Sequence, residues 1–360
     1  MPERYIHERP LRVYWEITRA CDLACRHCRA QAVPDRNPAE LTTAEGERLL
    51  EQLAAGADPR PHVILTGGDP LKRSDAFNLI AAARRRDLPV SVAPSATPLL
   101  TPDALQRLHD ASVDAISLSL DGSTAERHDA IRRVGGTFDR TVVAAGVAFD
   151  IGLPVQVNTL VCADTAEDLP AVYDLAAAVG AARWSLFFLV TVGRGGLLQP
   201  VSAARAEQLL VWAADLNAQR SAGLPLVTTT EAPQFRRVAL QRRRMARTPG
   251  TAGPGTGHGS SGGGIRDGNG ILFISHVGDV CPSGFLEIPV GNVRAANVLD
   301  LYRSAPLFRQ LRDADGFHGR CGYCEYRWVC GGSRARAFAA SGDPLGEDPL
   351  CVYHPWECHA

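Results

Sequence analysis

The sequence has no long apolar run and no excess of charge of either sign. Its 360 residues contain 38 Lys and Arg against 39 Asp and Glu, so the formal net charge is −1. This balance gives no reason to expect a nucleic acid or a membrane surface as a partner. No apolar stretch reaches the roughly 20 residues of a membrane span, and the N-terminal segment, MPERYIHERPLRVYWEIT, carries charges where a signal peptide would be apolar. We therefore expect a cytoplasmic protein with no nucleic-acid partner and no membrane attachment.

Cysteine, by contrast, is plentiful. There are ten cysteines, and eight of them fall into two groups near the ends of the chain, within 21–28 and 321–358. Because cytoplasmic thiols are kept reduced, clustered cysteines in such a protein indicate metal binding or catalysis rather than disulfides. Cys162 and Cys281 stand alone, and Cys162 is expected to be a buried, apolar-like residue. The pattern predicts two metal centres.

Short apolar runs alternate with amphipathic segments from residue 12 to residue 190. We expect six strands, over 12–17, 63–66, 90–93, 115–120, 155–161 and 184–190. Between them we expect helices over 42–55, 75–86, 102–111, 138–151 and 166–179, with Thr42 and Thr101 as N-caps. Strands that alternate with helices form a parallel sheet, since parallel neighbours need crossover connections. The predicted fold is α/β, a partial (β/α)6 barrel, because the sequence after residue 196 does not clearly supply two further units.

Three regions are expected along the chain. Residues 1–200 form the barrel core, residues 201–264 a helical segment with a Gly-rich linker, and residues 265–360 a smaller Cys-rich domain. The linker, 248–264, reads TPGTAGPGTGHGSSGGG, a composition typical of flexible segments. The segment before it is rich in arginine, and we expect these side chains to form a solvated helix face: Arg236, Arg237, Arg242, Arg243 and Arg244.

The first cysteine group, Cys21-x3-Cys25-x2-Cys28, provides three thiolates directly after the first predicted strand. Loops at the carboxyl ends of the strands carry the chemistry of α/β barrels. Thiolates are the ligands expected for iron–sulfur clusters, which ordinarily take four. Three cysteines without a local fourth suggest an iron left open for another ligand. The alternative is a structural zinc site that uses His27 as its fourth ligand.

In this spacing the sequence resembles the radical S-adenosylmethionine (SAM) superfamily, whose CxxxCxxC loop holds a [4Fe–4S] cluster. In that family SAM chelates the fourth iron. The segment TGGDP after the second strand resembles the family's GGEP motif, with Asp69 in place of the commoner Glu, and SLSLDG resembles the segment that faces the nucleoside. The resemblance implies that the following residues bind SAM: Gly67, Gly68, Asp69, Pro70, Ser117, Ser119, Asp121, Asn158, Val190 and Gly193.

The second cysteine group supplies a complete ligand set within 31 residues: Cys321, Cys324, Cys330 and Cys351. Together with the segments CGGSRARA and EDPLC, it resembles the SPASM or twitch extension of radical SAM proteins, most closely in the enzymes of heme and heme d1 synthesis and the mycofactocin maturase. Relatives often have an additional cysteine where this chain has Ser333. The resemblance therefore implies one auxiliary [4Fe–4S] cluster, with Cys281 and Cys358 not forming a second. A zinc ribbon-like site is the alternative.

The resemblance implies an enzyme that cleaves SAM reductively to a 5′-deoxyadenosyl radical, which removes hydrogen from a substrate C–H bond. We expect oxidative modification of a peptide precursor, with a separate peptide-recognition protein as a partner and flavodoxin or ferredoxin as the reductant. The alternative substrate is a tetrapyrrole carboxylate of the heme pathway, for which Arg194, Arg334 and Arg336 are candidate contacts. An alternative of another class is a zinc-stabilised binding protein without enzymatic activity.

Overall fold

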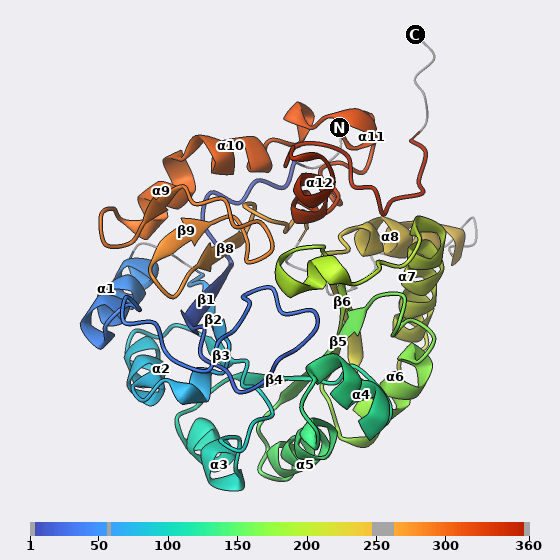
Figure 1. Cartoon of the computed structure of the whole chain (residues 1–360). Helices are drawn as coiled ribbons and strands as arrows, with labels where there is room; N and C mark the ends of the chain where they lie inside the picture. Colours follow the sequence, from blue (N-terminus) through green and yellow to red (C-terminus); the bar gives the residue numbers. More distant parts are fainter. Residues whose placement is uncertain (1–3, 56–58, 247–262, 356–360) are drawn as a thin grey trace.

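A single sheet of ten strands organises the chain. The computed structural model describes residues 4–55, 59–246 and 263–355, in which the strands follow the order β10-β9-β8-β1-β2-β3-β4-β5-β6-β7. From β8 through β7 every neighbouring pair is parallel, and only the pairs β8–β9 and β9–β10 are antiparallel. Helices surround the parallel strands as an outer ring (Figure 1). The predicted α/β partial barrel is confirmed.

All six expected strands form, with ends that differ by a few residues. They are β1 (Arg12–Thr18), β2 (His62–Gly67), β3 (Val90–Val92), β4 (Ala115–Ser119), β5 (Val155–Val161) and β6 (Arg183–Phe188). Side chains alternate between the two faces of the sheet, as in β4, where Ile116 and Leu118 are buried on the helix side while Ser117 and Ser119 are half-buried. This alternation makes the lumen of the barrel polar.

The expected helices also form. They are α1 (Thr43–Ala54), α2 (Ala76–Arg84), α3 (Pro102–Asp110), α5 (Thr137–Asp150) and α6 (Leu169–Ala178). Thr42 caps α1 by accepting from the backbone N–H of Glu45, whose carboxylate accepts from the N–H of Thr42, and Thr101 caps α3. The helix α4 (Ala125–Arg132) was not expected, because its sequence, AERHDAIR, has too few apolar residues to show a helical period.

Two further parallel strands extend the barrel beyond the six predicted. The first is β7 (Leu226–Thr230), between α7 (Ala203–Ala218) and α8 (Gln234–Ala246) in the segment expected to be helical. The second is β8 (Ile271–Ile274), which pairs with β1 from Arg12 to Trp15. The sheet therefore continues across the predicted domain boundary at residue 265. No ladder joins β7 to β8 among the described residues, so the barrel remains partial.

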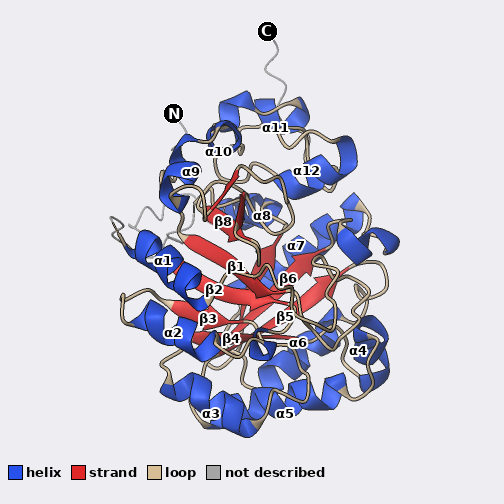
Figure 2. Cartoon of the chain, turned by 60° about the vertical axis from the view of Figure 1, so that its left-hand side comes forward, coloured by secondary structure: helices blue, strands red, loops and turns tan. Residues whose placement is uncertain are grey.

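The C-terminal elements sit at one end of this sheet (Figure 2). After β9 (Asp279–Cys281) and β10 (Gly291–Asn292) come four short helices: α9 (Val298–Ser304), α10 (Pro306–Arg312), α11 (Gly319–Tyr323) and α12 (Arg334–Ser341). One hydrophobic core includes residues of both regions, such as Trp15 of β1 and Tyr302 of α9, each completely buried. The predicted linker lies largely outside the described residues. Within the described ranges, no helix has both the length and the apolar character that crossing a membrane requires.

Candidate active site

The strands enclose a cavity of about 1680 Å³. This exceeds the few hundred to about 1,000 Å³ of common small-molecule pockets, so a large substrate can be accommodated beside a cofactor. Most of the residues expected to bind the cluster or SAM line it: Cys21, Cys25, Cys28, Gly67, Gly68, Ser117, Ser119, Asp121, Asn158 and Val190. Asp69, Pro70 and Gly193 are not among the lining residues.

The loop that carries the three cysteines is held by backbone contacts. The N–H of Cys21 donates to the carbonyl of Val33, which returns the loop to its starting point. From the far side of the barrel, the Arg194 guanidinium donates to the carbonyl of Cys25 at 2.9 Å, and its backbone N–H donates to that of Cys28 at 3.1 Å. Gly193 has φ of +53°, and a Cβ there would lie 2.4 Å from a carbonyl of this loop. Gly193 and Arg194 therefore shape the cysteine loop rather than the cavity surface.

Each of the three sulfur atoms has a polar neighbour. The backbone N–H of Leu23 donates to Cys21 Sγ and that of Ala32 to Cys28 Sγ, both at 3.4 Å, while Arg132 Nη1 lies 3.5 Å from Cys25 Sγ. Burial raises the pKa of the Cys21 thiol, so a cation is needed to hold it as a thiolate. Donors aimed at sulfur, together with buried thiols facing a cavity, fit a cluster with one open iron.

The zinc alternative can be compared with the same geometry. His27 lines the cavity, and burial lowers its pKa to about 4. Among residues 4–55, 59–246 and 263–355, no group of three or more His, Cys, Asp or Glu side chains is arranged to hold a single metal ion. A zinc site of the three cysteines and His27 is therefore not preformed in this part of the chain.

The TGGDP segment fastens β2 to the cysteine loop. The N–H of Gly68 donates to the carbonyl of Thr18 at 2.9 Å, and that of Asp69 to the carbonyl of Ala20 at 2.7 Å. A Cβ on Gly67, whose φ is +146°, would lie 2.1 Å from the Thr18 oxygen, so only glycine permits this approach. The carboxylate of Asp69 is buried and accepts from Thr97 Oγ1 at 2.7 Å. Asp69 thus supports the neighbouring loop and does not face the cavity.

Asp121 is linked to the sulfur of Cys25 by Arg132, which contacts both. Its carboxylate lies 2.5 Å from Arg132, the residue that contacts Cys25 Sγ, and it accepts from the N–H of Leu160 at 2.7 Å. Burial alone would raise the pKa of Asp121, but Arg132 outweighs it and the pKa is lowered. Arg132 belongs to the unexpected helix α4, so the sequence interpretation missed it. The chain Asp121–Arg132–Cys25 places a fixed positive charge beside the sulfur.

The arginines proposed for an anionic substrate have other roles. Besides Arg194, Arg334 is completely buried and its Nη2 lies 3.5 Å from Cys321 Sγ. Arg336 pairs with the buried Asp348 at 3.1 Å. None of the three lines the large cavity. Their guanidinium groups are occupied by backbone carbonyls, a carboxylate and a sulfur, so the expectation that they contact substrate is wrong.

The helix α8 supplies cavity arginines instead. Arg236, Arg242 and Arg243 line the large cavity, whereas Arg237 is buried and pairs with Glu207. The expectation of a solvated helix face is therefore wrong for Arg236 and Arg237. Helical spacing alone could not reveal this, because α8 flanks a barrel whose sheet ends at β7, and that arrangement is a tertiary feature.

The four C-terminal cysteines meet at a second, small cavity. Cys321, Cys324, Cys330 and Cys351 all line a space of about 30 Å³. Burial, with a smaller contribution from the neighbouring thiols, raises the pKa of Cys324 to about 11 and that of Cys330 to about 12. Thiols that resist ionisation, such as those of Cys324 and Cys330, are expected to need cationic iron to hold them as thiolates. The residues fit one four-cysteine cluster, while Cys358 lies outside the described residues.

The other two cysteines remain apart from both sites. Cys281, on β9, is buried, and burial raises the pKa of its thiol to about 12. Cys162 is completely buried in a small apolar cluster with Leu160 and Leu189, in agreement with its expected apolar role.

Comparison with known proteins agrees with this geometry. The model of the radical SAM superfamily matches residues 15–176. The chain is 39% identical over 348 residues to the AdoMet-dependent heme synthase of Nitratidesulfovibrio vulgaris, covering 95% of this chain and 92% of that protein. It is 30% identical over 349 residues to the pre-heme d1 synthase of Dinoroseobacter shibae, covering 94% of this chain and 85% of that protein.

A solved structure shows the same fold at lower identity. SuiB of Streptococcus suis, bound to S-adenosylmethionine, aligns with a TM-score of 0.74 and 19% identity over 96% of this chain and 78% of that chain. SuiB has also been solved with its precursor peptide SuiA. The cysteine spacing, the cavity and these likenesses lead to one conclusion: the chain belongs to the radical SAM superfamily and is a SPASM/twitch-type enzyme that uses a [4Fe–4S] cluster and SAM.

Proposed function

We propose that this enzyme acts on the carboxylate side chains of a tetrapyrrole in a heme-forming step. The proposal is supported by the likeness to AdoMet-dependent heme synthase, of which this chain covers nearly the whole length. We further propose that Cys21, Cys25 and Cys28 hold the SAM-binding cluster, and that Cys321, Cys324, Cys330 and Cys351 hold one auxiliary cluster. When bound, the first cluster and SAM supply a radical that removes a hydrogen atom from the substrate.

The choice of substrate rests on one observation: several arginines that line the cavity have no counter-ion in the part of the chain that the structure describes. Arg12, Arg183 and Arg243 line it, and none has an ion pair or a side-chain hydrogen bond within the described chain. Arg236 has only a carbonyl, that of Val329, at 3.4 Å. Burial, followed by the charge of Arg12, lowers the pKa of both Arg183 and Arg236, the latter to about 10.

Five acidic residues line the cavity. Glu231 and Asp267 lie together, and burial raises the pKa of Glu231 well above its usual range. The other three are already paired with arginines. Asp121 forms an ion pair with Arg132, Asp215 with Arg242, and Asp114 with Arg84. Several guanidinium groups without counter-ions in one cavity favour a ligand with several carboxylates. A tetrapyrrole with propionate side chains has this chemistry, and the cavity of about 1680 Å³ has room for it.

The proposed reaction is the oxidative decarboxylation of a propionate side chain. One hydrogen atom leaves the carbon next to the ring, the bond to the carboxylate breaks, carbon dioxide departs, and one electron leaves as the vinyl double bond forms. In this chain the cavity arginines would hold the carboxylates, and the walls exclude water from the radical. We propose that the auxiliary cluster receives the departing electron, and that a cytoplasmic flavodoxin or ferredoxin supplies the electron that cleaves SAM.

Modification of a peptide, which the sequence interpretation ranked first, is the second candidate. It is favoured by the fold shared with SuiB, whose complex with a precursor peptide is known. At 19% identity that likeness shows the fold alone. We therefore rank the tetrapyrrole first, and the test below distinguishes the two.

The test measures binding and conversion of iron coproporphyrin III, an iron tetrapyrrole with four propionates. We expect the anaerobic, reconstituted enzyme to bind it and, with SAM and reductant, to release carbon dioxide and form vinyl groups seen by mass spectrometry. Arg236→Gln should weaken binding about 10- to 100-fold, since a charge-assisted hydrogen bond is worth about 1.5–3 kcal/mol. Arg244→Gln, on the same helix but outside the cavity, is the control. Absence of porphyrin binding by the native enzyme would contradict the proposal and favour a peptide.

A further inference from the structure

Two carboxyl groups face each other in the cavity wall beyond the arginines. Glu231 directly follows β7 and Asp267 precedes β8, and both line the large cavity. Neither has an ion pair among the described residues, and Asp267 Oδ2 accepts from the backbone N–H of Ala335 at 3.0 Å. Burial and the facing Asp267 raise the pKa of Glu231 well above its usual range. Two neighbouring carboxylates do not both ionise readily away from water, so Glu231 resists ionisation.

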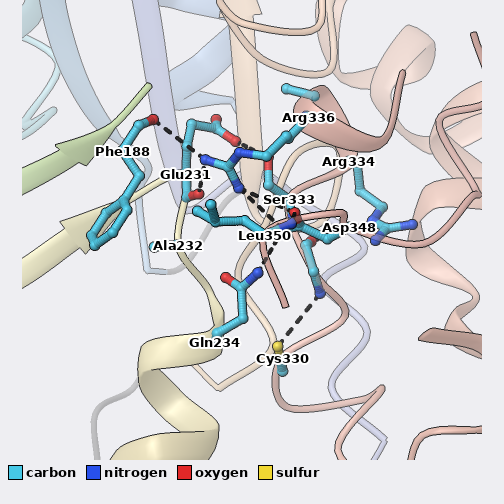
Figure 3. Close-up of polar contacts among 12 residues, drawn as sticks. Phe188, Glu231, Ala232, Gln234, Cys330, Ser333, Arg334, Arg336, Asp348 and Leu350 are labelled. Atoms are coloured by element: carbon cyan, nitrogen blue, oxygen red, sulfur yellow. Dashed lines mark hydrogen bonds and ion pairs between the residues drawn. The ribbon is translucent and has the colours of Figure 1, made fainter. Parts of the chain in front are cut away.

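The groups around the pair fix its position without neutralising it. Ser333 Oγ donates to Glu231 Oε2 and accepts from the backbone N–H of Arg336. The guanidinium of Arg336 donates to the backbone carbonyl of Glu231 at 2.7 Å, but its charge is paired with Asp348 (Figure 3). At the carboxyl end of β6, the backbone carbonyls of Phe188 and Leu189 accept hydrogen bonds from Arg336.

A third cavity residue beside the pair carries a charge without a counter-ion among the described residues. Arg266 is 3% exposed, lines the same cavity, and its Nε has no hydrogen-bond partner among the described residues. Its other nitrogens donate to the carbonyls of Gly264, Leu311 and Arg312. Arg266 Nε is covered by Gly331, so a ligand would interact with the charge of Arg266 rather than with this donor. That charge has no ion pair among the described residues, and a buried charge without a counter-ion costs free energy unless an anion lies near it. This is an observation independent of the carboxyl pair, and it points to an anionic ligand group.

We propose that Arg266, Glu231 and Asp267 form a proton-dependent subsite for one carboxylate of the substrate. Arg266 attracts the carboxylate, and the acid pair admits it only while it keeps its proton. Loss of that proton would place a second negative charge beside the ligand and repel it. Binding of the substrate and protonation of the pair are therefore linked, and each favours the other. This inference rests on the proposed function, because it assumes an anionic substrate.

The same wall separates the two cysteine sites. Gly332 lines both the large cavity and the small cavity of the four cysteines, and Ser333 follows it. Gln234, at the start of α8, faces the small cavity and donates to Asp348 at 2.7 Å (Figure 3). A substrate carboxylate bound here would lie next to the segment that carries Cys330. The subsite therefore brings the side chain that loses an electron close to the proposed electron acceptor.

The experiment follows the dissociation constant of iron coproporphyrin III from pH 6.5 to pH 9 by absorbance titration of the reconstituted enzyme. For the native enzyme we expect the constant to rise about tenfold per pH unit above the apparent pKa of the pair, since one proton is linked to binding. Glu231→Gln, which cannot lose this proton, should bind almost independently of pH. Glu167→Gln, on the outer surface, is the matched control and should keep the native slope. A native slope in Glu231→Gln, or no slope in the native enzyme, would overturn the proposal.

A second measurement separates this inference from the proposed function. Infrared difference spectra of the native enzyme minus Glu231→Gln, without porphyrin, should show the band of a protonated carboxyl group at pH 7. If the band is present but no porphyrin binds, the proposed function fails while the proton-holding pair stands without its proposed ligand. If the band is absent, the pair is ionised and the subsite proposal is wrong even where porphyrin binds.

Discussion

The two cysteine sites differ most in what they face. Cys21, Cys25 and Cys28 line a cavity of about 1680 Å³ and supply three sulfur atoms, whereas Cys321, Cys324, Cys330 and Cys351 line a space of about 30 Å³ and supply four. A cluster held by the first three cysteines would keep one iron open toward the cavity. A cluster held by the other four would have all its irons ligated by the chain. The same ligand chemistry can thus serve bond cleavage in one place and electron transfer in the other.

The electrostatic surroundings of the two sites differ as well. Cys25 Sγ is contacted by Arg132, whose charge is balanced by the buried Asp121. Cys321 Sγ is contacted by Arg334, which is buried among backbone carbonyls and has no ion pair among the described residues. A buried guanidinium without a carboxylate is expected to favour the extra negative charge of a reduced cluster. This supports the proposed role of the C-terminal site as an electron acceptor.

The largest effect is expected when each site is removed in turn. Cys25→Ala should abolish formation of 5′-deoxyadenosine, because the open iron is lost. Cys330→Ala should retain SAM cleavage but lose most of the product, because the substrate radical has no acceptor for its electron. Anaerobic chromatography of deoxyadenosine and product checks both, and iron content should fall from about eight to about four per chain in each variant. Equal loss of deoxyadenosine in the two variants would contradict the assignment of SAM cleavage to the N-terminal site alone.

Removal of the buried counter-ion at the first site should have an intermediate effect. Asp121→Asn leaves the charge of Arg132 unbalanced beside Cys25 and disturbs the group that positions this ligand. Residues that support metal ligands typically contribute about 10- to 100-fold in activity or metal affinity, and we expect a loss of deoxyadenosine formation in that range. Asp168→Asn, which alters hydrogen bonds to Ser123 outside the cavity, is the control and should stay within about twofold of the native rate.

The smallest effect concerns the shape of the cysteine loop. Gly193→Ala would force a Cβ to within 2.4 Å of the Arg29 carbonyl at a φ of +53°. We expect a loss of about 1–3 kcal/mol in the free energy of unfolding, together with a several-fold lower activity. Gly196→Ala is the matched control, since the nearest atom to its Cβ would lie at 3.8 Å. Thermal unfolding of both variants checks this, and equal melting temperatures would show that Gly193 does not shape the loop.

Much of the barrel could be predicted from local sequence, and the exceptions have physical reasons. The first six strands contain runs of Val, Ile and Leu between amphipathic helices, a signal that does not depend on distant contacts. In β7, LVTTT, threonines replace most of the apolar residues. The β-branched side chains are the only local signal for a strand, and this strand was not predicted. The pairing of β8 with β1 joins residues about 260 positions apart, and no local pattern specifies it.

The site shows a similar division. Cysteine spacing and paired glycines are local features, and they identified both cysteine groups and the TGGDP turn. The partners of arginine are set by tertiary packing. Arg194, Arg334 and Arg336 are therefore candidate substrate contacts by sequence but not in the structure. Arg236 was expected on a solvated helix face, and Arg132 was overlooked. The buried carboxyl pair of Glu231 and Asp267 combines residues 36 positions apart that follow no motif. Charges without partners become visible only when the fold is known.

Electron paramagnetic resonance of the reduced single-cluster variants tests the difference between the two sites most directly. Cys330→Ala should retain only the N-terminal cluster, and its reduced signal should change when SAM is added, because SAM binds the open iron. Cys25→Ala should retain only the C-terminal cluster, and SAM should leave its signal unchanged. A SAM-dependent change in Cys25→Ala, or none in Cys330→Ala, would contradict the assignment of one open and one closed cluster.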